Sequence, residues 1–359
     1  MTPMPGTGTL SLDAISLLLV WTAIAIYALA FIAYAIDLAR RSDIALKAQD
    51  AAARETARER ELVAAAASGT AMSVETPDGV VTFDDDAPSG RTRPRSDKPR
   101  FVWARIGTSL TVLGWLFHVA GDVTRGVAAG RVPWSNMYEF ALTGTMLIVA
   151  VYLVVLFRYD LRFLGAFITG LAVVLLGGAT LAFYVEVVPL ADPLKSVWLV
   201  IHVFVASLAT ALFALAFGLS VMQLLQSRRE RRAVAASADG EAPRRGASFL
   251  RTLPDADAIE SLAYRFAIVG FIFWTFTLIA GSIWANDAWG RYWGFDTKEV
   301  WTFVIWVLYA GYIHARATRG WRGTRSAWLS IIGFTAVLFN FTIVNVFFKG
   351  LHAYSGLTS

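Results

Sequence analysis

Cysteine is absent from this chain of 359 residues, and histidine occurs only four times. The lack of cysteine excludes disulfides, thiol redox chemistry and any thiolate-bound metal within the chain. Charge is also scarce, since Asp, Glu, Lys and Arg make up 16% of the residues and hydrophobic residues make up 56%. Several apolar runs reach the ~20 residues that cross a bilayer, which is typical of an integral membrane protein.

The apolar runs predict an all-α fold, a polytopic membrane bundle of about eight transmembrane helices. Each run is bounded by charged or turn-forming residues, which mark the expected helix ends. The predicted spans are Ala14 to Ile36, Val102 to Val123, Met137 to Phe157, Phe163 to Phe183, Val197 to Leu225, Leu262 to Trp284, Val300 to Ala315 and Ala327 to Phe348.

The distribution of arginine predicts the orientation of these spans. Short cytoplasmic loops retain Lys and Arg, and here arginine gathers in residues 40–100, 228–245 and 316–325, which fall on one side of an eight-span layout. Both termini and the Trp-rich residues 284–306 then lie outside, in a multi-pass protein of the plasma membrane. The net charge of +5 comes mostly from these arginines, so the expected partner is the lipid bilayer and not nucleic acid.

Composition divides the chain into three regions. Residues 1–36 are expected to form an N-terminal transmembrane anchor, because the run is too long for the core of a signal peptide and no basic segment precedes it. Residues 37–100 are expected to be a cytoplasmic linker that begins as an Ala-, Arg- and Glu-rich helix and ends disordered. Residues 101–359 form the main membrane domain, with a basic cytoplasmic linker at 226–258.

Residues 284–306 read WANDAWGRYWGFDTKEVWTFVIW and combine aromatic side chains with acidic, basic and amide ones. One explanation is a belt of interfacial aromatics at the headgroup level, but such a belt needs one or two rings per helix end. A large flat ligand with polar edges would use both kinds of side chain, as stacking surface and as polar partners. The tryptophans are Trp284, Trp289, Trp293, Trp301 and Trp306.

All four histidines lie in or beside predicted spans, where ionisable groups are costly and often functional. His202 and His352 are expected near the outer ends of their spans, on the face that carries the Trp-rich segment. Two neutral imidazoles there can approach a haem iron from opposite sides, although a hydrogen-bonded packing role is the alternative for each. His118 and His314 are a possible second pair within the membrane, offset in depth by roughly 10–15 Å.

Other metals fit this chain poorly, because it lacks Cys/His zinc spacing and a two-histidine, one-carboxylate cluster on a single element. Haem propionates would need cationic or amide partners at the membrane edge. The sequence offers several such groups and does not choose among Arg125, Arg131, Asn136, Arg291 and Lys298.

The segment WANDAWGRYWGFDTKEVWTFVIWVLYAGYIHAR resembles the tryptophan-rich WWD signature of haem-handling proteins in cytochrome c maturation. Together with HVAGDVTRGVAAGRVPWSNMYEF, WLVIHV and VNVFFKGLHAYSG, it resembles the CcsA (ResC) family, a subunit of the system II cytochrome c synthetase. The resemblance covers residue 101 to the end. The family's usual Trp-x-Trp-Asp-Pro-Lys-Glu stretch departs here, because Phe295 replaces the second tryptophan and lacks an indole N–H donor.

The resemblance implies a subunit of a cytochrome c haem lyase that moves haem b across the membrane and presents it for attachment to the CXXCH motif of apocytochrome c. It implies that His202 and His352 ligate haem at the outer face and that His118 and His314 serve a haem within the membrane. It also implies a ResB-type membrane partner and a thioredoxin-like reductant acting on the apocytochrome.

On the hypothesis that follows from this resemblance, three aromatic side chains are expected to pack the porphyrin, namely Trp289, Trp293 and Phe295, beside Trp284. Asp296 either orients a ligand or begins the helix that follows it. Two other functions remain open: a bis-histidine haem b electron-transfer protein and a haem exporter without lyase chemistry.

Overall fold

The computed structural model describes residues 10–67, 102–190, 192–238, 249–318, 320–348 and 350–351. These ranges are helical with no strand, as the sequence predicted. The helices are α1 (Leu12–Ala67), α2 (Val102–Ala129), α3 (Met137–Leu156), α4 (Gly165–Ala182), α5 (Val197–Ala238), α6 (Ala256–Trp289), α7 (Thr297–Thr318), α8 (Thr324–Phe341) and α9 (Ile343–Phe347). Single 3-10 turns lie at Arg162–Leu164, Asp192–Leu194 and Phe249–Thr252.

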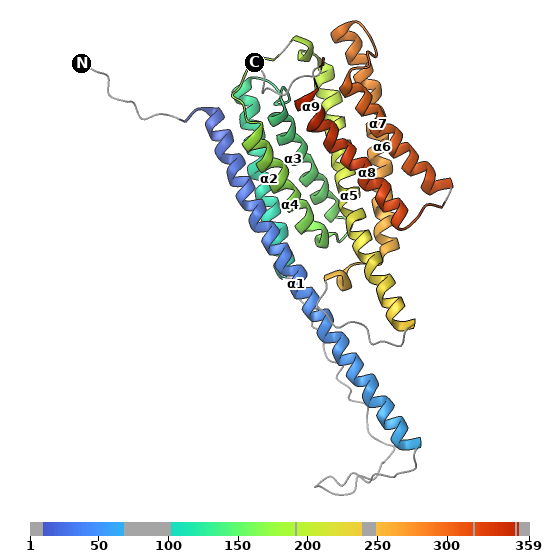
Figure 1. Ribbon diagram of the computed structural model, residues 1–359. Helices are drawn as coiled ribbons and strands as arrows, with labels where there is room; N and C mark the ends of the chain where they lie inside the picture. Colours follow the sequence, from blue (N-terminus) through green and yellow to red (C-terminus); the bar gives the residue numbers. More distant parts are fainter. Residues whose placement is uncertain are drawn as a thin grey trace, which may run out of the picture.

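The long helices run up and down in chain order, so that each lies antiparallel to the next (Figure 1). Among the described residues, seven segments are long and apolar enough to cross a membrane. The helix that falls short is α7, whose first turn carries Lys298 and Glu299. Helix α7 nevertheless runs between α6 and α8 and is connected to them by turns at its two ends (Figure 1).

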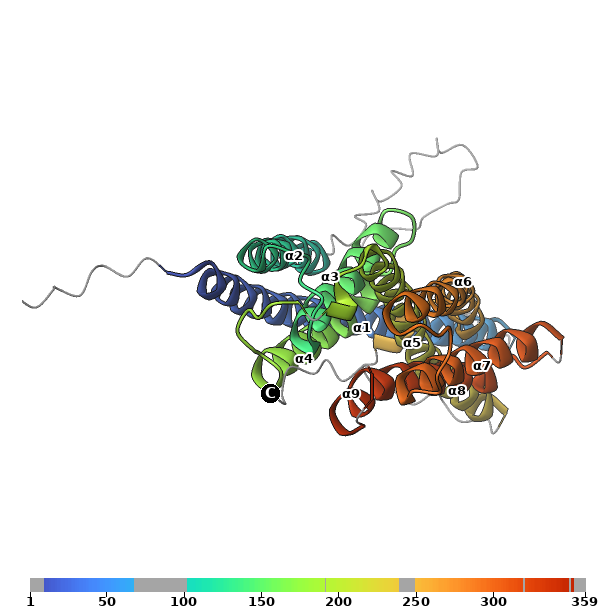
Figure 2. The ribbon, with the colours of Figure 1, turned by 90° about the horizontal axis from the view of Figure 1, so that it is seen from above.

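Turns at one end of the bundle contain several of the candidate residues, among them Trp293, Phe295 and Asp296. We call this the aromatic end; it is formed by residues 130–136, 183–190 and 290–296, and it is uppermost in Figure 1. The start of α1 and the helix α9 also lie there. Seen from above in Figure 2, α1 to α4 form one group and α6 to α9 another, with α5 between them.

The centre of the bundle is aromatic where α5 meets the second group. Phe213 of α5 stacks on Tyr309 of α7 with ring centroids 3.6 Å apart and planes 10° from parallel. One turn further along α5, Phe217 stacks on Phe334 of α8 at 4.9 Å. These planar contacts bury large apolar surfaces and fix α5 against both neighbouring helices.

The first span and the helical start predicted for residues 37–100 form one continuous helix, α1, which belongs to the bundle. The predicted span Ala14 to Ile36 continues without a break to Ala67, and α1 packs along α2 and α4. At the end opposite the aromatic end, Asp37 accepts a hydrogen bond from the amide of Ala104 at 3.1 Å and so caps the first turn of α2. The part of the 37–100 linker expected to be disordered, residues 68–100, lies outside the described residues.

The basic linker expected at 226–258 begins later than the sequence suggested. Helix α5 continues through SRRERRAVAASA to Ala238, because Arg, Glu and Ala are strong helix formers once a helix is already nucleated. Residues 239–248 lie outside the described ranges, and α6 begins at Ala256 with Asp255 as its N-cap.

Gly165, at the start of α4, allows α1 to approach closely. A Cβ atom there would lie 2.5 Å from the ring of Tyr34. We expect Gly165→Ala to destabilise the bundle by about 1–3 kcal/mol, because the buried ring has to move. Gly177→Ala on the same helix is the control, since nothing lies within 4 Å of its Cβ position. Denaturation in detergent micelles measures the difference; equal stability of the two variants would contradict this packing.

Candidate functional site

A cavity lies between the two groups of helices and reaches the aromatic end. Its walls come from the turn before α3, from α3, α5, α6 and α8, and from the segment 289–302. Its volume is about 260 Å³. Since this is close to the lower limit of small-molecule sites, roughly 300 Å³, a larger ligand would also cover surface around the cavity.

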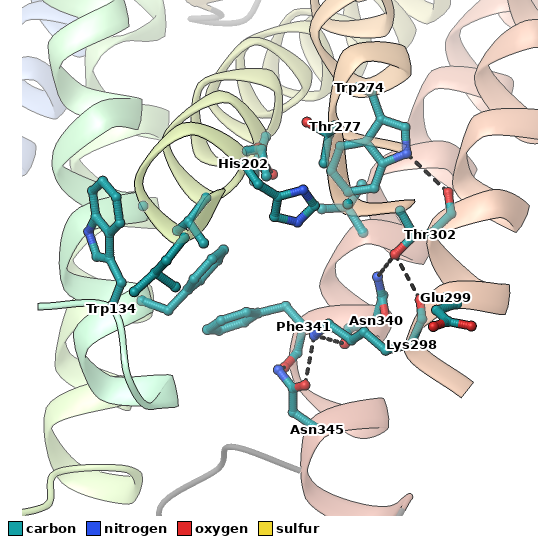
Figure 3. A pocket seen from close by; sticks show the side chains of 18 of the residues that line it. Trp134, His202, Trp274, Thr277, Lys298, Glu299, Thr302, Asn340, Phe341 and Asn345 are labelled. Carbon is teal, nitrogen blue, oxygen red and sulfur yellow. Dashed lines mark hydrogen bonds between the residues drawn. The ribbon is translucent and has the colours of Figure 1, made fainter. Parts of the chain in front are cut away.

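His202 projects from α5 into this cavity (Figure 3). Its imidazole lies against the backbone of α6, where a Cβ atom on Gly281 would come within 2.7 Å of the ring atom Cε1. The edge of the ring also meets Trp284, with centroids 5.5 Å apart and planes at 61°. The imidazole of His202 therefore contacts the α6 backbone at Gly281 and the ring of Trp284, and these two contacts set its orientation in the cavity.

The five tryptophans of residues 284–306 divide into two sets. Trp284, Trp289 and Trp293 line the cavity. The other two pack between helices: Trp301 lies against Phe339 with ring centroids 4.4 Å apart, and Trp306 donates its indole N–H to Thr275 at 3.0 Å. The five tryptophans are close together in the sequence. In the structure, the first three line the cavity, whereas Trp301 and Trp306 pack against neighbouring helices.

The loop between α6 and α7 is shaped by its own backbone contacts. Gly290 ends α6 in a left-handed conformation, with φ of 68°. Glu299 then accepts hydrogen bonds from the amides of Gly294 at 2.8 Å and Asp296 at 3.1 Å. Asp296 in turn accepts from the amide of Lys298 at 3.3 Å, which is the reciprocal pattern of a capping box at the start of α7. The helix-start role of Asp296 is therefore seen directly.

Phe295 does not line the cavity. It adopts a left-handed backbone conformation, with φ of 59°, and its side chain is 80% exposed. Its ring meets the edge of Trp293, at 6.3 Å between centroids. This conformation is strained for a residue with a Cβ atom, so the capping contacts of Glu299 on either side hold the turn in place.

Polar groups gather at one edge of the cavity, where α7 faces α8 and α9 (Figure 3). The ammonium of Lys298 donates to the side-chain oxygen of Asn345 at 2.7 Å and to the backbone oxygen of Asn340 at 3.2 Å. The buried Asn340 Oδ1 and Glu299 Oε1 have no hydrogen-bond partner. Buried acceptors of this kind are normally paired, so this edge suits a ligand or water that donates hydrogen bonds.

Arg125 and Arg131, which the sequence offered as possible propionate partners, are both paired with carboxylates of the chain. Arg125 is fully buried, where it pairs with Asp13 and with Glu139 (3.1 Å to the latter) and donates to the backbone oxygen of Val185 at 2.7 Å. Arg131 pairs with Glu139 at 2.8 Å. Both guanidinium groups form ion pairs with carboxylates of the chain, so neither is available to pair with a haem propionate.

This buried ion network joins α1 to α2 and α3 at the aromatic end. Tyr184 adds a hydrogen bond from its hydroxyl to Asp13 at 2.7 Å. Burial, together with this bond, raises the pKa of Tyr184 to about 12, so the hydroxyl remains a donor at physiological pH. The network thus places the two guanidinium groups of Arg125 and Arg131 against the two carboxylates of Asp13 and Glu139.

The remaining histidines occupy different surroundings. His118 is fully buried in α2, with Nε2 3.0 Å from the oxygen of Leu142 and Nδ1 3.3 Å from the Tyr27 hydroxyl. His314 is exposed on α7, and Figure 1 shows α2 and α7 on opposite sides of α5. The structure does not bring these two side chains together. His352 lies outside the described residues, but the chain can be followed to Leu351, next to Asp296.

Several cavity residues were missed at the sequence level. Trp134 precedes α3, where its indole N–H donates to Thr143 at 2.7 Å. Trp274 of α6 donates to the backbone oxygen of Thr302 at 3.1 Å, and Phe341 of α8 stacks on Phe140 of α3 at 5.4 Å. All three lie in or beside apolar runs, so nothing in the local sequence separates them from ordinary packing residues.

Comparison with known proteins finds a match of residues 134–352 to a family described as Cytochrome C assembly protein. Cytochrome c biogenesis protein CcsA of Guillardia theta is 32% identical over 263 residues, which are 70% of this chain and 86% of that protein. The CcsA protein of Synechococcus elongatus is 32% identical over 282 residues, 69% of this chain and 87% of that protein.

A solved structure, Cytochrome c Heme Lyase CcmF, is similar in fold. The TM-score is 0.55 and the sequence identity is 15%, with 95% of this chain and 48% of that chain covered. This chain therefore spans about half the length of that protein, and the likeness concerns the helical architecture alone.

Proposed function

The chain belongs to the cytochrome c assembly protein family, and on that premise we propose that it holds haem at the aromatic end for covalent attachment to apocytochrome c. The observation that carries this proposal is the imidazole of His202, held against Gly281 inside a cavity walled by tryptophans. A neutral imidazole is a common axial ligand of haem iron, and indole rings suit the face of a porphyrin.

The residues around His202 fit a haem in chemical character. Trp284, Trp289 and Trp293 provide aromatic surface, and the amino group of Lys298 provides a hydrogen-bond donor at the polar edge of the cavity. We propose His202 and His352 as the two axial ligands, and Lys298 as a partner for a propionate. Arg125 and Arg131 are left out, because internal carboxylates occupy them.

The proposed chemistry is the addition of two apocytochrome thiols to the two vinyl groups of haem b. In each addition a carbon–sulfur bond forms, and the thiol hydrogen ends on the neighbouring vinyl carbon, so no electron is gained or lost overall. The chain contributes no thiol, since it contains no cysteine. Its contribution is to position haem, which can supply a large part of a rate enhancement without a dedicated acid or base.

We propose further that a ResB-type membrane subunit completes the synthetase and that a thioredoxin-like protein keeps the CXXCH thiols reduced. The aromatic end then faces away from the cytoplasm in the plasma membrane, which agrees with the described arginines near the C-terminal ends of α1 and α5 and in the turn after α7, away from the aromatic end (Figure 1). Haem reaches this end from the cytoplasmic side.

The experiment that tests this function is co-expression of the chain with a ResB-type partner and an apocytochrome carrying a CXXCH motif. Haem that stays with the apocytochrome after denaturation is covalently attached, and its appearance only with this chain supports the proposal. Bound haem that never transfers would favour an electron-transfer protein. Free haem outside the cell without holocytochrome would favour an exporter.

Gly281→Ala is expected to weaken haem binding by about 10-fold, because the added Cβ atom displaces the His202 imidazole from its place against α6. Haem titration of the purified protein measures this change. The control is Gly311→Ala on α7, where nothing lies within 4 Å of the Cβ position. Equal affinity in both variants would show that the place of the imidazole against α6 does not matter.

A further inference from the structure

The last described residues of the chain lie against the start of α7. The amide of Leu351 donates a hydrogen bond to Oδ1 of Asp296 at 2.9 Å. The neighbouring Gly350 approaches the same carboxylate so closely that a Cβ atom there would lie 2.1 Å from Oδ1. These residues are 55 positions apart in sequence, so the contact joins the C-terminal segment to the Trp-rich loop.

A second contact joins the same two parts of the chain. The ammonium of Lys298, two residues after Asp296, donates to Asn345 Oδ1 at 2.7 Å and to the backbone oxygen of Asn340 at 3.2 Å. Asn345 is fixed in turn by the hydrogen bond from its amide group to the oxygen of Phe341 at 2.7 Å. The segment after α8 is therefore held at two points, by Asp296 just before α7 and by Lys298 in the first turn of α7.

The carboxylate of Asp296 has a defined position because its own backbone is fixed. Glu299 accepts the amide hydrogen of Asp296, and the second oxygen of Asp296 accepts the amide hydrogen of Lys298. A capping box of this kind sets both the start of the helix and the direction of its N-cap side chain. Oδ1 is thus left directed at the amide of Leu351.

We propose that Asp296 and Lys298, with Asn345, Gly350 and Leu351, form a clasp that fixes the chain immediately before His352 at the rim of the cavity containing His202. In this view Asp296 is a positioning residue for His352 and does not contact haem. The inference rests on the proposed function, in which His352 is an axial ligand.

Covalent geometry connects the clasp to that ligand. Consecutive Cα atoms are about 3.8 Å apart, so fixing Leu351 limits the region that the next residue can reach. A ligand residue on a flexible terminus loses conformational entropy when it binds iron, and this loss weakens binding. A ligand residue on a fixed segment has already lost most of that entropy on folding, so its binding is tighter. The clasp therefore explains why an acidic residue stands in the Trp-rich loop although it does not line the cavity.

The first test measures hydrogen exchange at the Leu351 amide in the haem-free full chain. We expect protection in the wild type and its loss in both Asp296→Ala and Gly350→Ala, which break the contact from opposite sides. Asp296→Asn keeps an acceptor oxygen and should retain most of the protection. The matched control is Asp287→Ala, an exposed acidic residue of the same Trp-rich segment. An unprotected amide in the wild type, or unchanged protection in Asp296→Ala, would overturn the clasp.

The second test asks whether the clasp acts through the ligand. Haem affinity in Asp296→Ala and Gly350→Ala should fall by about 10-fold and be restored by added imidazole, which replaces a misplaced axial ligand. Affinity that is unchanged, or a loss that imidazole does not restore, would contradict the positioning role. A wild type that binds no haem would contradict the proposed function, and the exchange result would still decide the clasp.

Discussion

His202→Ala is expected to reduce the formation of holocytochrome c by about 100-fold, because it removes the imidazole that we propose as an axial ligand. No other histidine of the described residues lines the cavity, so no neighbour can replace it. The measurement is covalently bound haem on a co-expressed apocytochrome, normalised to the amount of the chain in the membrane.

The matched control for this prediction is Ile201→Ala. Ile201 is the preceding residue of α5, but its side chain is 38% exposed and does not line the cavity. We expect near wild-type activity for this variant. Normal holocytochrome levels in His202→Ala, or an equal loss in both variants, would remove the basis for assigning the ligand.

Arg125→Ala is expected to destabilise the folded bundle by about 3–5 kcal/mol. The guanidinium is fully buried and pairs with Asp13 of α1 and Glu139 of α3, so its removal leaves Glu139 buried beside Arg131 alone and Asp13 without its cation. Separation of α1 from the rest of the bundle should precede or accompany unfolding.

Unfolding of the purified protein in mixed detergent micelles, followed by circular dichroism, measures this effect. Arg105→Ala is the control, because Arg105 is an exposed arginine of the same helix. Identical unfolding of the two variants would show that the buried ion network contributes little to stability.

The sequence predicted the helical passes well, because their cause is local. Apolar runs of sufficient length form helices wherever a bilayer surrounds them, so the predicted start of the second span at Val102 and of the third at Met137 agree with α2 and α3. The end of α5 was misplaced for a related reason. A basic Ala-rich stretch reads as a linker by composition, but its residues extend an existing helix at little cost.

The sequence predicted several of the residues that line the cavity, but it did not predict the long-range contacts that these and the neighbouring charged residues make. The choice of His202 and of three tryptophans rested on residue type and membrane depth, and the structure places all four at one cavity. Long-range contacts decided the rest. Arg125 is occupied because residues 13 and 139 meet it, and Asp296 faces Leu351 across 55 positions. Neither contact leaves a sign in the local sequence.

Whether His202 binds haem iron can be read from the absorption spectrum of the purified protein. We expect a reduced-minus-oxidised spectrum of low-spin, bis-imidazole haem, with haem b by pyridine haemochrome. In His202→Ala that haem should be lost or become five-coordinate. A wild type without haem, or a spectrum unchanged in His202→Ala, would contradict the claim and leave the tryptophan-lined cavity to another ligand.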